Sequence, residues 1–255
     1  MARMTGMRAL AAAMVVAAPL GMASKAEAGT AVGLELVLLI DVSGSVDASE
    51  YALQKGGYVQ AFQSAAVQNA IMGSQLGSIA VTYVEWSGAA QQAQLVNWTL
   101  VNDAASANAF AAAIAGTSRA FSGQTAVGSA INYGAGLLGA DNGFDGLRKV
   151  MDVSGDGTAN AGANTAAARD AAVAAGITIN GLTIGGASLL TWYQTNVIGG
   201  PGAFAIGVND FADFAAAIEQ KLVREITGVP EPATFALLGF GLAALGMAAR
   251  RRKAA

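Results

Sequence analysis

Five side chains with oxygen donors occur in three separate stretches of the chain. Asp41, Ser43 and Ser45 alternate directly after a hydrophobic run. Thr125 follows a Gly-Gln pair, and Asp156 stands between two glycines after another hydrophobic run. Carboxylate and hydroxyl oxygens are the hard ligands that Mg²⁺ and similar cations select. If the fold brings the three stretches together, the sequence predicts a site for one divalent cation.

The elements that must position these residues alternate along the chain. The predicted strands are 33–41, 78–86, 94–101, 148–154, 177–184 and 203–208. The predicted helices are 47–72, 103–115, 125–138, 164–175 and 210–226. Strands that alternate with helices are typical of parallel crossovers. We therefore expect an α/β fold with a doubly wound, mostly parallel, Rossmann-like central sheet flanked by helices.

This topology predicts that the three stretches converge. In a doubly wound sheet, ligands bind beyond the carboxyl ends of the strands, where the strand order reverses. Asp41 ends the first predicted strand and Asp156 follows the fourth. These two strands are neighbours in the common order 3-2-1-4-5-6. Thr125 lies on the loop that enters the helix before the fourth strand, so we expect it at the same edge.

In order and spacing, the five residues resemble the metal-ion-dependent adhesion site of von Willebrand factor type A (vWA) domains. The similarity covers roughly residues 33–226. The motifs Val-Glu-Trp-Ser at 84–87 and Asp-Val-Ser-Gly-Asp-Gly at 152–157 resemble a bacterial branch of that superfamily. The resemblance implies the vWA fold and a role in metal-dependent adhesion.

The resemblance also implies a role for each residue. Ser43 and Ser45 would ligate the metal directly, and Thr125 directly or through water. Asp41 and Asp156 would act mostly through bound waters, and a carboxylate from a protein partner would complete the octahedron. Mg²⁺ demands near-octahedral oxygen ligands. Two carboxylates that contact the ion only through a water molecule leave its positive charge incompletely balanced. Mg²⁺ is therefore the expected ion, with Mn²⁺ and Ca²⁺ as open alternatives.

Other side chains near these motifs allow different interpretations. Asp152-x-Ser154-x-Asp156 resembles the start of a calcium-binding EF-hand loop, but the twelfth position is Ala163, which offers no ligand oxygen. We expect Asp152 to lie within the strand, hydrogen-bonded to a neighbouring loop. Glu85 is either a buried partner or a group behind the ligands. Two tryptophans are expected to pack in the interior: Trp86 and Trp98.

The N-terminal residues 1–28 have the pattern of a secretory signal peptide. Arg3 and Arg8 precede an apolar stretch, and Ala26-Glu27-Ala28 is typical of a cleavage site. We therefore expect an exported protein whose mature chain begins at Gly29.

The C-terminal residues 229–255 have the pattern of a sorting signal. Val229-Pro230-Glu231-Pro232 ends any helix, and the uncharged stretch 233–249 spans roughly 26 Å as a helix, near the lower limit for crossing a bilayer. The basic cluster 250–253 is expected to stay cytoplasmic. This segment resembles the PEP-CTERM signal of Gram-negative bacteria. The apolar stretch and the basic cluster predict an inner-membrane anchored precursor. The resemblance implies cleavage by an exosortase and transfer to the cell surface or extracellular matrix. A tail anchor that is never cut is the alternative.

The central part of the chain, 29–228, suits one domain with a sizeable core. Between residues 29 and 230 there are 15 acidic and 7 basic side chains, a net charge of −8, so nucleic acid is not an expected partner. The chain has no Cys and no His. Their absence excludes disulfides, His- or Cys-ligated zinc, and His-dependent nucleophiles.

Together these features predict an exported binding module, and not an enzyme, that acts in metal-dependent protein–protein adhesion or scaffolding at the envelope or in the matrix. One alternative is a metal-assisted hydrolase with Asp156 or Glu85 as base. A second is a purely structural matrix protein whose ion stabilises the fold.

Overall fold

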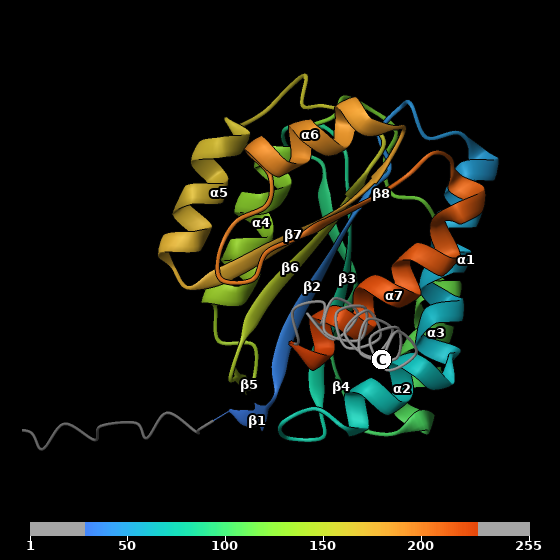
Figure 1. Cartoon of the computed structure of the whole chain (residues 1–255), viewed down its shortest axis with the longest axis vertical. Helices are drawn as coiled ribbons and strands as arrows, with labels where there is room; N and C mark the ends of the chain where they lie inside the picture. Colours follow the sequence, from blue (N-terminus) through green and yellow to red (C-terminus); the bar gives the residue numbers. More distant parts are fainter. Residues whose placement is uncertain (1–28, 229–255) are drawn as a thin grey trace, which may run out of the picture.

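The computed structural model describes residues 29–228, and its centre is a six-stranded sheet (Figure 1). The strands are β2 (Leu34–Asp41), β3 (Ile79–Trp86), β4 (Gln92–Val101), β6 (Lys149–Gly155), β7 (Ile177–Ile184) and β8 (Ala205–Val208). The order is β4-β3-β2-β6-β7-β8, and only the β3–β4 pair is antiparallel. This is the order expected from the sequence, and the predicted fold class is confirmed.

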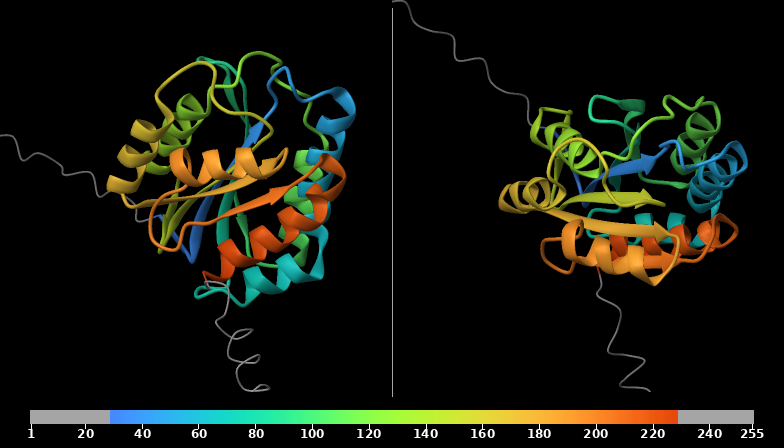
Figure 2. Two further views of the ribbon diagram at one scale, coloured as in Figure 1. Left: turned by 45° about the horizontal axis from the view of Figure 1, so that its top comes forward. Right: turned by 90° about the horizontal axis from the view of Figure 1, so that it is seen from above.

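Helices cover both faces of this sheet (Figures 1 and 2). One face carries α1 (Ala48–Gln63), α2 (Ala65–Met72), α3 (Ala104–Ala115) and α7 (Phe214–Thr227). The other face carries α4 (Val127–Gly139), α5 (Thr165–Ala174) and α6 (Ala187–Asn196). Within residues 29–228, none of the helices combines the length and the apolar composition that a membrane crossing requires. The predicted signal peptide and sorting segment lie outside the described residues.

Strand β2 shows why the sheet is buried on both sides. All eight of its residues are buried. Leu36, Leu38 and Ile40 pack into the core under α1 and α7, while Val37 and Leu39 pack into the core under α4. A central parallel strand covered on both faces is expected to be a nearly continuous hydrophobic run. The hydrophobic pattern therefore ends where the polar residues of the candidate site begin.

Four features differ from the sequence expectation. The predicted helix 47–72 is two helices, because Ser64 is extended and its hydroxyl accepts a hydrogen bond from the Val67 amide to cap α2. Helix α6 was not predicted. Strands β1 (Thr30–Val32) and β5 (Phe144–Gly146) form a separate two-stranded sheet, and the helix predicted from 210 begins with a 3-10 turn, η1 (Phe211–Asp213). Segments of three residues are too short to show a hydrophobic period.

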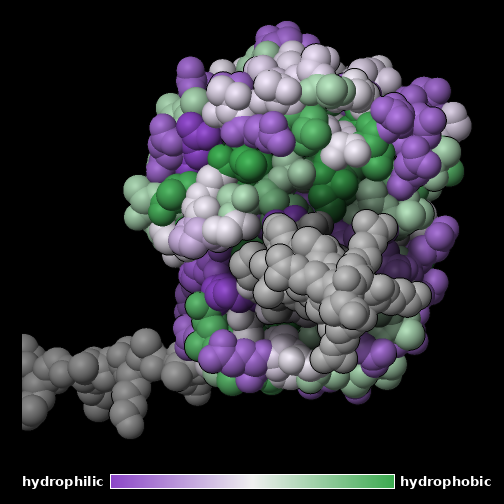
Figure 3. Space-filling model, viewed as in Figure 1, coloured by the Kyte–Doolittle hydropathy of each residue, from purple (hydrophilic) through white to green (hydrophobic). Residues whose placement is uncertain are grey.

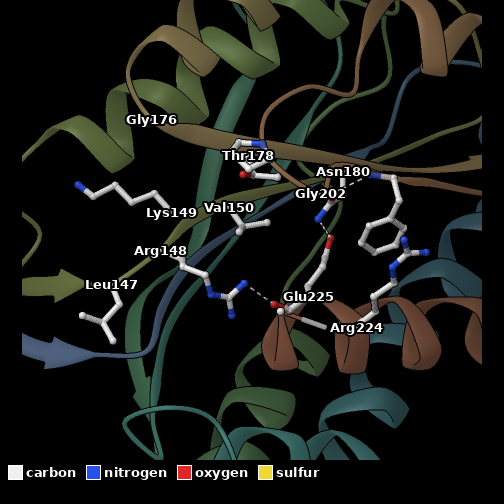
Figure 4. A pocket seen from close by; sticks show the side chains of 13 residues that line it. Leu147, Arg148, Lys149, Val150, Gly176, Thr178, Asn180, Gly202, Arg224 and Glu225 are labelled. Carbon is white, nitrogen blue, oxygen red and sulfur yellow. Dashed lines mark hydrogen bonds between the residues drawn. The ribbon is translucent and has the colours of Figure 1, made fainter. Parts of the chain in front are cut away.

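At the amino ends of β6 and β7, a cavity of about 460 Å³ opens beside α7 (Figure 4). Beneath it, Lys221 Nζ lies 2.5 Å from both Asp152 Oδ1 and Glu225 Oε1, and Asn180 donates to Glu225 Oε1 at 2.9 Å. The prediction that Asp152 bonds to a loop is therefore wrong. Its partner is a lysine of α7, because Asp152 lies on the sheet face that this helix covers.

The cavity is at the opposite end of β6 from Asp156, so it is separate from the candidate metal site. Arg148, which precedes β6, donates to the carbonyl oxygens of Glu225 and Ile226 and so closes the end of α7. On the side of the molecule drawn in Figure 3, hydrophilic and hydrophobic residues are mixed. The α7 end of the described chain is thereby tied to the amino ends of the strands.

Candidate metal centre

The first part of the site is the turn that follows β2. Asp41 is fully buried, and its Oδ1 accepts a hydrogen bond from the Ser43 amide at 2.8 Å. The Val42 amide donates to the Trp86 carbonyl at 2.9 Å, and the Gly44 amide donates to the Gly123 carbonyl at 2.8 Å. A short carboxylate that bonds to a nearby backbone amide is a common way to stabilise a turn. The loop that carries Ser43 and Ser45 is thus held in place by the neighbouring strand and loop.

The hydroxyls of this turn meet residues from two other loops. Thr125 Oγ1 donates to Ser43 Oγ at 3.2 Å, and Ser43 Oγ lies 3.2 Å from Ser45 Oγ. Ser45 Oγ donates to Asp156 Oδ1 at 2.7 Å. Asp41 joins this chain of hydrogen bonds through the Ser43 amide. All five residues singled out from the sequence therefore lie together at the carboxyl edge of the sheet.

Thr125 is positioned by a residue that the sequence reasoning missed. The Thr125 amide donates to Asn160 Oδ1 at 2.9 Å, and the Asn160 amide donates to the Thr125 carbonyl at 2.9 Å. Ser87, after β3, holds the same loop by donating to the Gln124 carbonyl at 2.9 Å. Bonds to main-chain groups leave no residue pattern in a sequence, so Asn160 could be recognised only in three dimensions.

Glu85 supports the Thr125 loop from below. Its buried carboxylate accepts from the Tyr51 hydroxyl and from the Ala120 amide, each at 2.8 Å. Burial raises the pKa of Glu85. Arg119, beside it, donates to the carbonyl oxygens of Val42 and Ser43 at 2.9 and 2.8 Å. Glu85 is thus a group behind the proposed ligands, and Arg119 ties their two loops together.

The donor set fits a hard divalent cation. It consists of two carboxylates and three hydroxyls. Within residues 29–228, no cluster of three or more His, Cys, Asp or Glu side chains offers a different kind of metal site. Asp41 Oδ2 is buried and has no hydrogen-bond partner in this part of the chain. An unsatisfied buried oxygen of this kind costs free energy unless a further group serves it. Water, including the water shell of a bound cation, meets that requirement.

The electrostatics of the site agree with this fit. Burial, with a smaller contribution from the nearby charge of Asp156, raises the pKa of Asp41 to about 7 against the hydrogen bonds from Ser43. Burial also raises the pKa of Asp156, against the hydrogen bond from Ser45. Two carboxylates that are hard to ionise beside each other are stabilised as anions by a positive charge between them.

The EF-hand interpretation finds no support in this arrangement. Asp152 is paired with Lys221, and Ser154 Oγ accepts from the Tyr58 hydroxyl at 3.3 Å. Both side chains are therefore engaged on the sheet face under α1 and α7. Only Asp156 of that motif reaches the hydroxyl cluster.

The strand order and the helices on both faces define the chain as a vWA-type α/β domain. It belongs to the family described as "Protein of unknown function (DUF1194)", whose model matches residues 31–230. The PEP-CTERM protein-sorting motif matches residues 228–253. This motif marks an exported protein sorted to the cell surface. A search of curated proteins found no match.

Solved structures with the same fold include matrix and adhesion proteins. Proximal thread matrix protein 1 from the mussel byssus is 17% identical, with a TM-score of 0.60, over 77% of this chain and 48% of that one. The pilus adhesin SpaC from Lactobacillus rhamnosus GG is 16% identical, with a TM-score of 0.58, over 78% and 31%. A von Willebrand factor type A protein from Catenulispora acidiphila is 14% identical, with a TM-score of 0.54, over 76% and 43%.

These likenesses concern the fold. The chain spans about half the length of the mussel protein and about a third of the adhesin. One structure of the mussel protein is described as having a zinc-occupied MIDAS motif. An ion can thus be held by a protein of this fold.

Proposed function

We propose that this protein is an exported vWA-type binding module that holds a divalent cation, with Mg²⁺ preferred, and binds a carboxylate of a protein partner. The observation that carries the proposal is the meeting of three hydroxyls and two carboxylates from three loops at one sheet edge. The residues that would hold the ion are Asp41, Ser43, Ser45, Thr125 and Asp156. When bound, the ion would offer an electrophilic position to an oxygen ligand from outside.

The chain's own residues prepare this edge for a partner. Ser45 is exposed, whereas Ser43 and Thr125 are buried beneath it. A partner therefore meets the site from the side of Ser45 and Asp156. Because the net charge between residues 29 and 230 is −8, an acidic partner needs a local positive charge at the contact, which the cation provides.

The placement of the sorting motif suits a surface role. The described chain ends at Gly228, beside Arg148 at the amino ends of the strands. The proposed metal site is at the carboxyl ends of the strands, which is the opposite edge of the sheet. In an inner-membrane precursor tethered through residues 229–255, this edge would face away from the membrane, and exosortase processing would release the module to the surface or matrix.

The first test of the proposal is direct metal binding. Titration calorimetry of the wild type with Mg²⁺ and Mn²⁺ is expected to show one site, and Asp41→Ala to abolish it while circular dichroism shows a retained fold. Asp145→Ala, an exposed acidic residue of β5 at the opposite edge, is the matched control and is expected to bind like the wild type. Wild-type protein that binds neither ion would contradict the proposal.

The second test separates a binding module from a structural matrix protein. The purified protein is used to retain partners from an envelope and matrix fraction, with Mg²⁺ or with EDTA. A partner retained with Mg²⁺ and released by EDTA, and not retained by Asp41→Ala, is the expected result. If EDTA lowers the melting temperature but no partner is retained under either condition, the ion serves the fold alone.

A further inference from the structure

Behind the proposed metal centre, two buried oxygen atoms lack any partner within residues 29–228. They are Asp41 Oδ2 at the end of β2 and the hydroxyl oxygen of Tyr193 on α6. Both residues are fully buried. Buried polar groups are nearly always hydrogen-bonded, to protein or to ordered water, and an unsatisfied one costs free energy. Two such atoms in one place therefore require an explanation.

The two oxygens face the same point above Gly155. A Cβ atom built on Gly155 would lie 2.5 Å from the Tyr193 hydroxyl oxygen and 2.9 Å from Asp41 Oδ2. Any side chain at position 155 would therefore displace one of them. The two oxygens are therefore near neighbours beside Gly155, and their separation is within the reach of one bridging water molecule.

The tyrosine ring is held firmly in this position. A Cβ atom built on Gly181 would lie only 2.9 Å from Tyr193 Cδ1, so the ring packs directly on β7. The ring also makes an edge contact with Trp192, with centroids 5.6 Å apart. A ring held on two sides presents its hydroxyl in one direction, and a phenol can donate to a carboxylate.

We propose that Tyr193 is a positioning residue of the metal centre: its hydroxyl donates to one water held above Gly155, and this water donates to Asp41 Oδ2. The inference rests on the proposed function, because Asp41 is a proposed metal-site residue. A carboxylate offers about four lone-pair sites, so this link leaves others for the water shell of the ion. The link fixes the carboxylate orientation and extends the site to helix α6, which packs against β7.

The test is Tyr193→Phe, which keeps the ring and removes the hydroxyl. Two measurements are made: the dissociation constant for Mn²⁺ by calorimetry, and the melting temperature of the metal-free protein. The link predicts a dissociation constant weakened roughly tenfold, as for other residues behind metal ligands, together with a lower melting temperature. If the hydroxyl has no partner, its removal relieves an unsatisfied group. The melting temperature then stays or rises with unchanged affinity, and the inference is overturned.

Tyr58→Phe is the matched control. Tyr58 is also fully buried, on the opposite face of the sheet, and its hydroxyl donates to Ser154 Oγ. Its loss is expected to lower the melting temperature without changing the dissociation constant for Mn²⁺. A control that weakened metal binding as much as Tyr193→Phe would show a general loss of stability, and would overturn the assignment of Tyr193.

A double-mutant cycle makes the test independent of metal. In the metal-free protein, Tyr193→Phe is expected to lower the stability of the wild type but not that of Asp41→Ala, because the partner of the link is already gone. Equal effects in both backgrounds would overturn the inference even if the metal centre is real. Wild-type protein that binds no metal would instead overturn the proposed function, and the cycle would still decide whether Tyr193 and Asp41 are coupled.

Discussion

At the scale of single residues, the candidate site depends on hydroxyl groups that bond to one another. Thr125 Oγ1 and Ser45 Oγ both lie 3.2 Å from Ser43 Oγ, at the long end of hydrogen-bond distances for oxygen pairs. Such bonds are readily exchanged for bonds to a cation. The hydroxyls therefore serve as uncharged ligands, and the two carboxylates supply the charge.

The contribution of Thr125 can be measured with two substitutions of similar size. Thr125→Val keeps the shape of the side chain but removes the ligand oxygen, so the dissociation constant for Mg²⁺ is expected to rise at least about tenfold. Thr125→Ser keeps the hydroxyl and is expected to bind within about threefold of the wild type. Titration calorimetry of both variants with Mg²⁺ measures these dissociation constants. Equal affinity of Thr125→Val and the wild type would remove Thr125 from the proposed ligands.

At the scale of elements, the site depends on loops that are tied together by main-chain hydrogen bonds. Arg119 joins its own loop, through the Phe121 carbonyl, to the carbonyls of Val42 and Ser43 after β2. A guanidinium group can hold several oxygens at once because it has five donors in a fixed plane. Arg119 and the bond from the Gly44 amide to the Gly123 carbonyl together set the relative position of the Ser43 and Thr125 loops.

Arg119→Ala is expected to weaken Mg²⁺ binding roughly tenfold, because the supporting bonds behind the ligands are lost. It is also expected to speed amide hydrogen exchange at residues 42–45. Lys55→Ala is the matched control. Lys55 also lies over the Tyr51 ring but donates to the carbonyls of Ala115 and Thr117, away from the β2 loop. Unchanged exchange and affinity in Arg119→Ala would show that the loops are held by other contacts.

At the scale of the whole molecule, the polar side chains at the carboxyl ends of the strands differ in role from the buried charged group farther down the sheet. The carboxyl ends carry the candidate metal centre. Nearer the amino ends, in the middle of β6, the buried group of Asp152, Lys221 and Glu225 joins the sheet to α7. Two carboxylates there share one ammonium. Burial raises the pKa of Glu225 to about 7, with the charge of Asp152 as the next cause, and burial also raises the pKa of Asp152.

This group predicts a pH-dependent stability. A glutamate with a pKa of 4.5 when unfolded and about 7 when folded binds more protons in the folded state between these values. The free energy of unfolding should therefore fall as the pH rises from about 5 to 8, by roughly 1–3 kcal/mol. Asp152, Lys221 and Asn180 face the Glu225 carboxyl directly, and Arg148 and Tyr58 also interact with its charge.

Glu225→Gln cannot ionise at this position and is expected to reduce this dependence, as measured by denaturant unfolding at pH 5.5 and pH 8. The part that remains is the contribution of Asp41, whose pKa is also raised to about 7. Glu219→Gln, on the same helix but partly exposed, is the control and should keep the slope of the wild type. A wild-type stability that does not fall over this range would contradict the prediction, because it would show that Glu225 is already ionised beside Lys221 at pH 5.5.

The sequence alone determined the class of the fold, the strand order and the five candidate residues. These are set by long hydrophobic runs such as β2 and by the polar residues that follow each run, and both remain visible in one dimension. Only the tertiary structure revealed the break at Ser64, helix α6 with Tyr193, the loop supports Asn160 and Arg119, and the pairing of Asp152 with Lys221. These features depend on bonds to main-chain atoms and on contacts between distant elements. Such interactions impose no period or spacing on the sequence, so three-dimensional packing decides them.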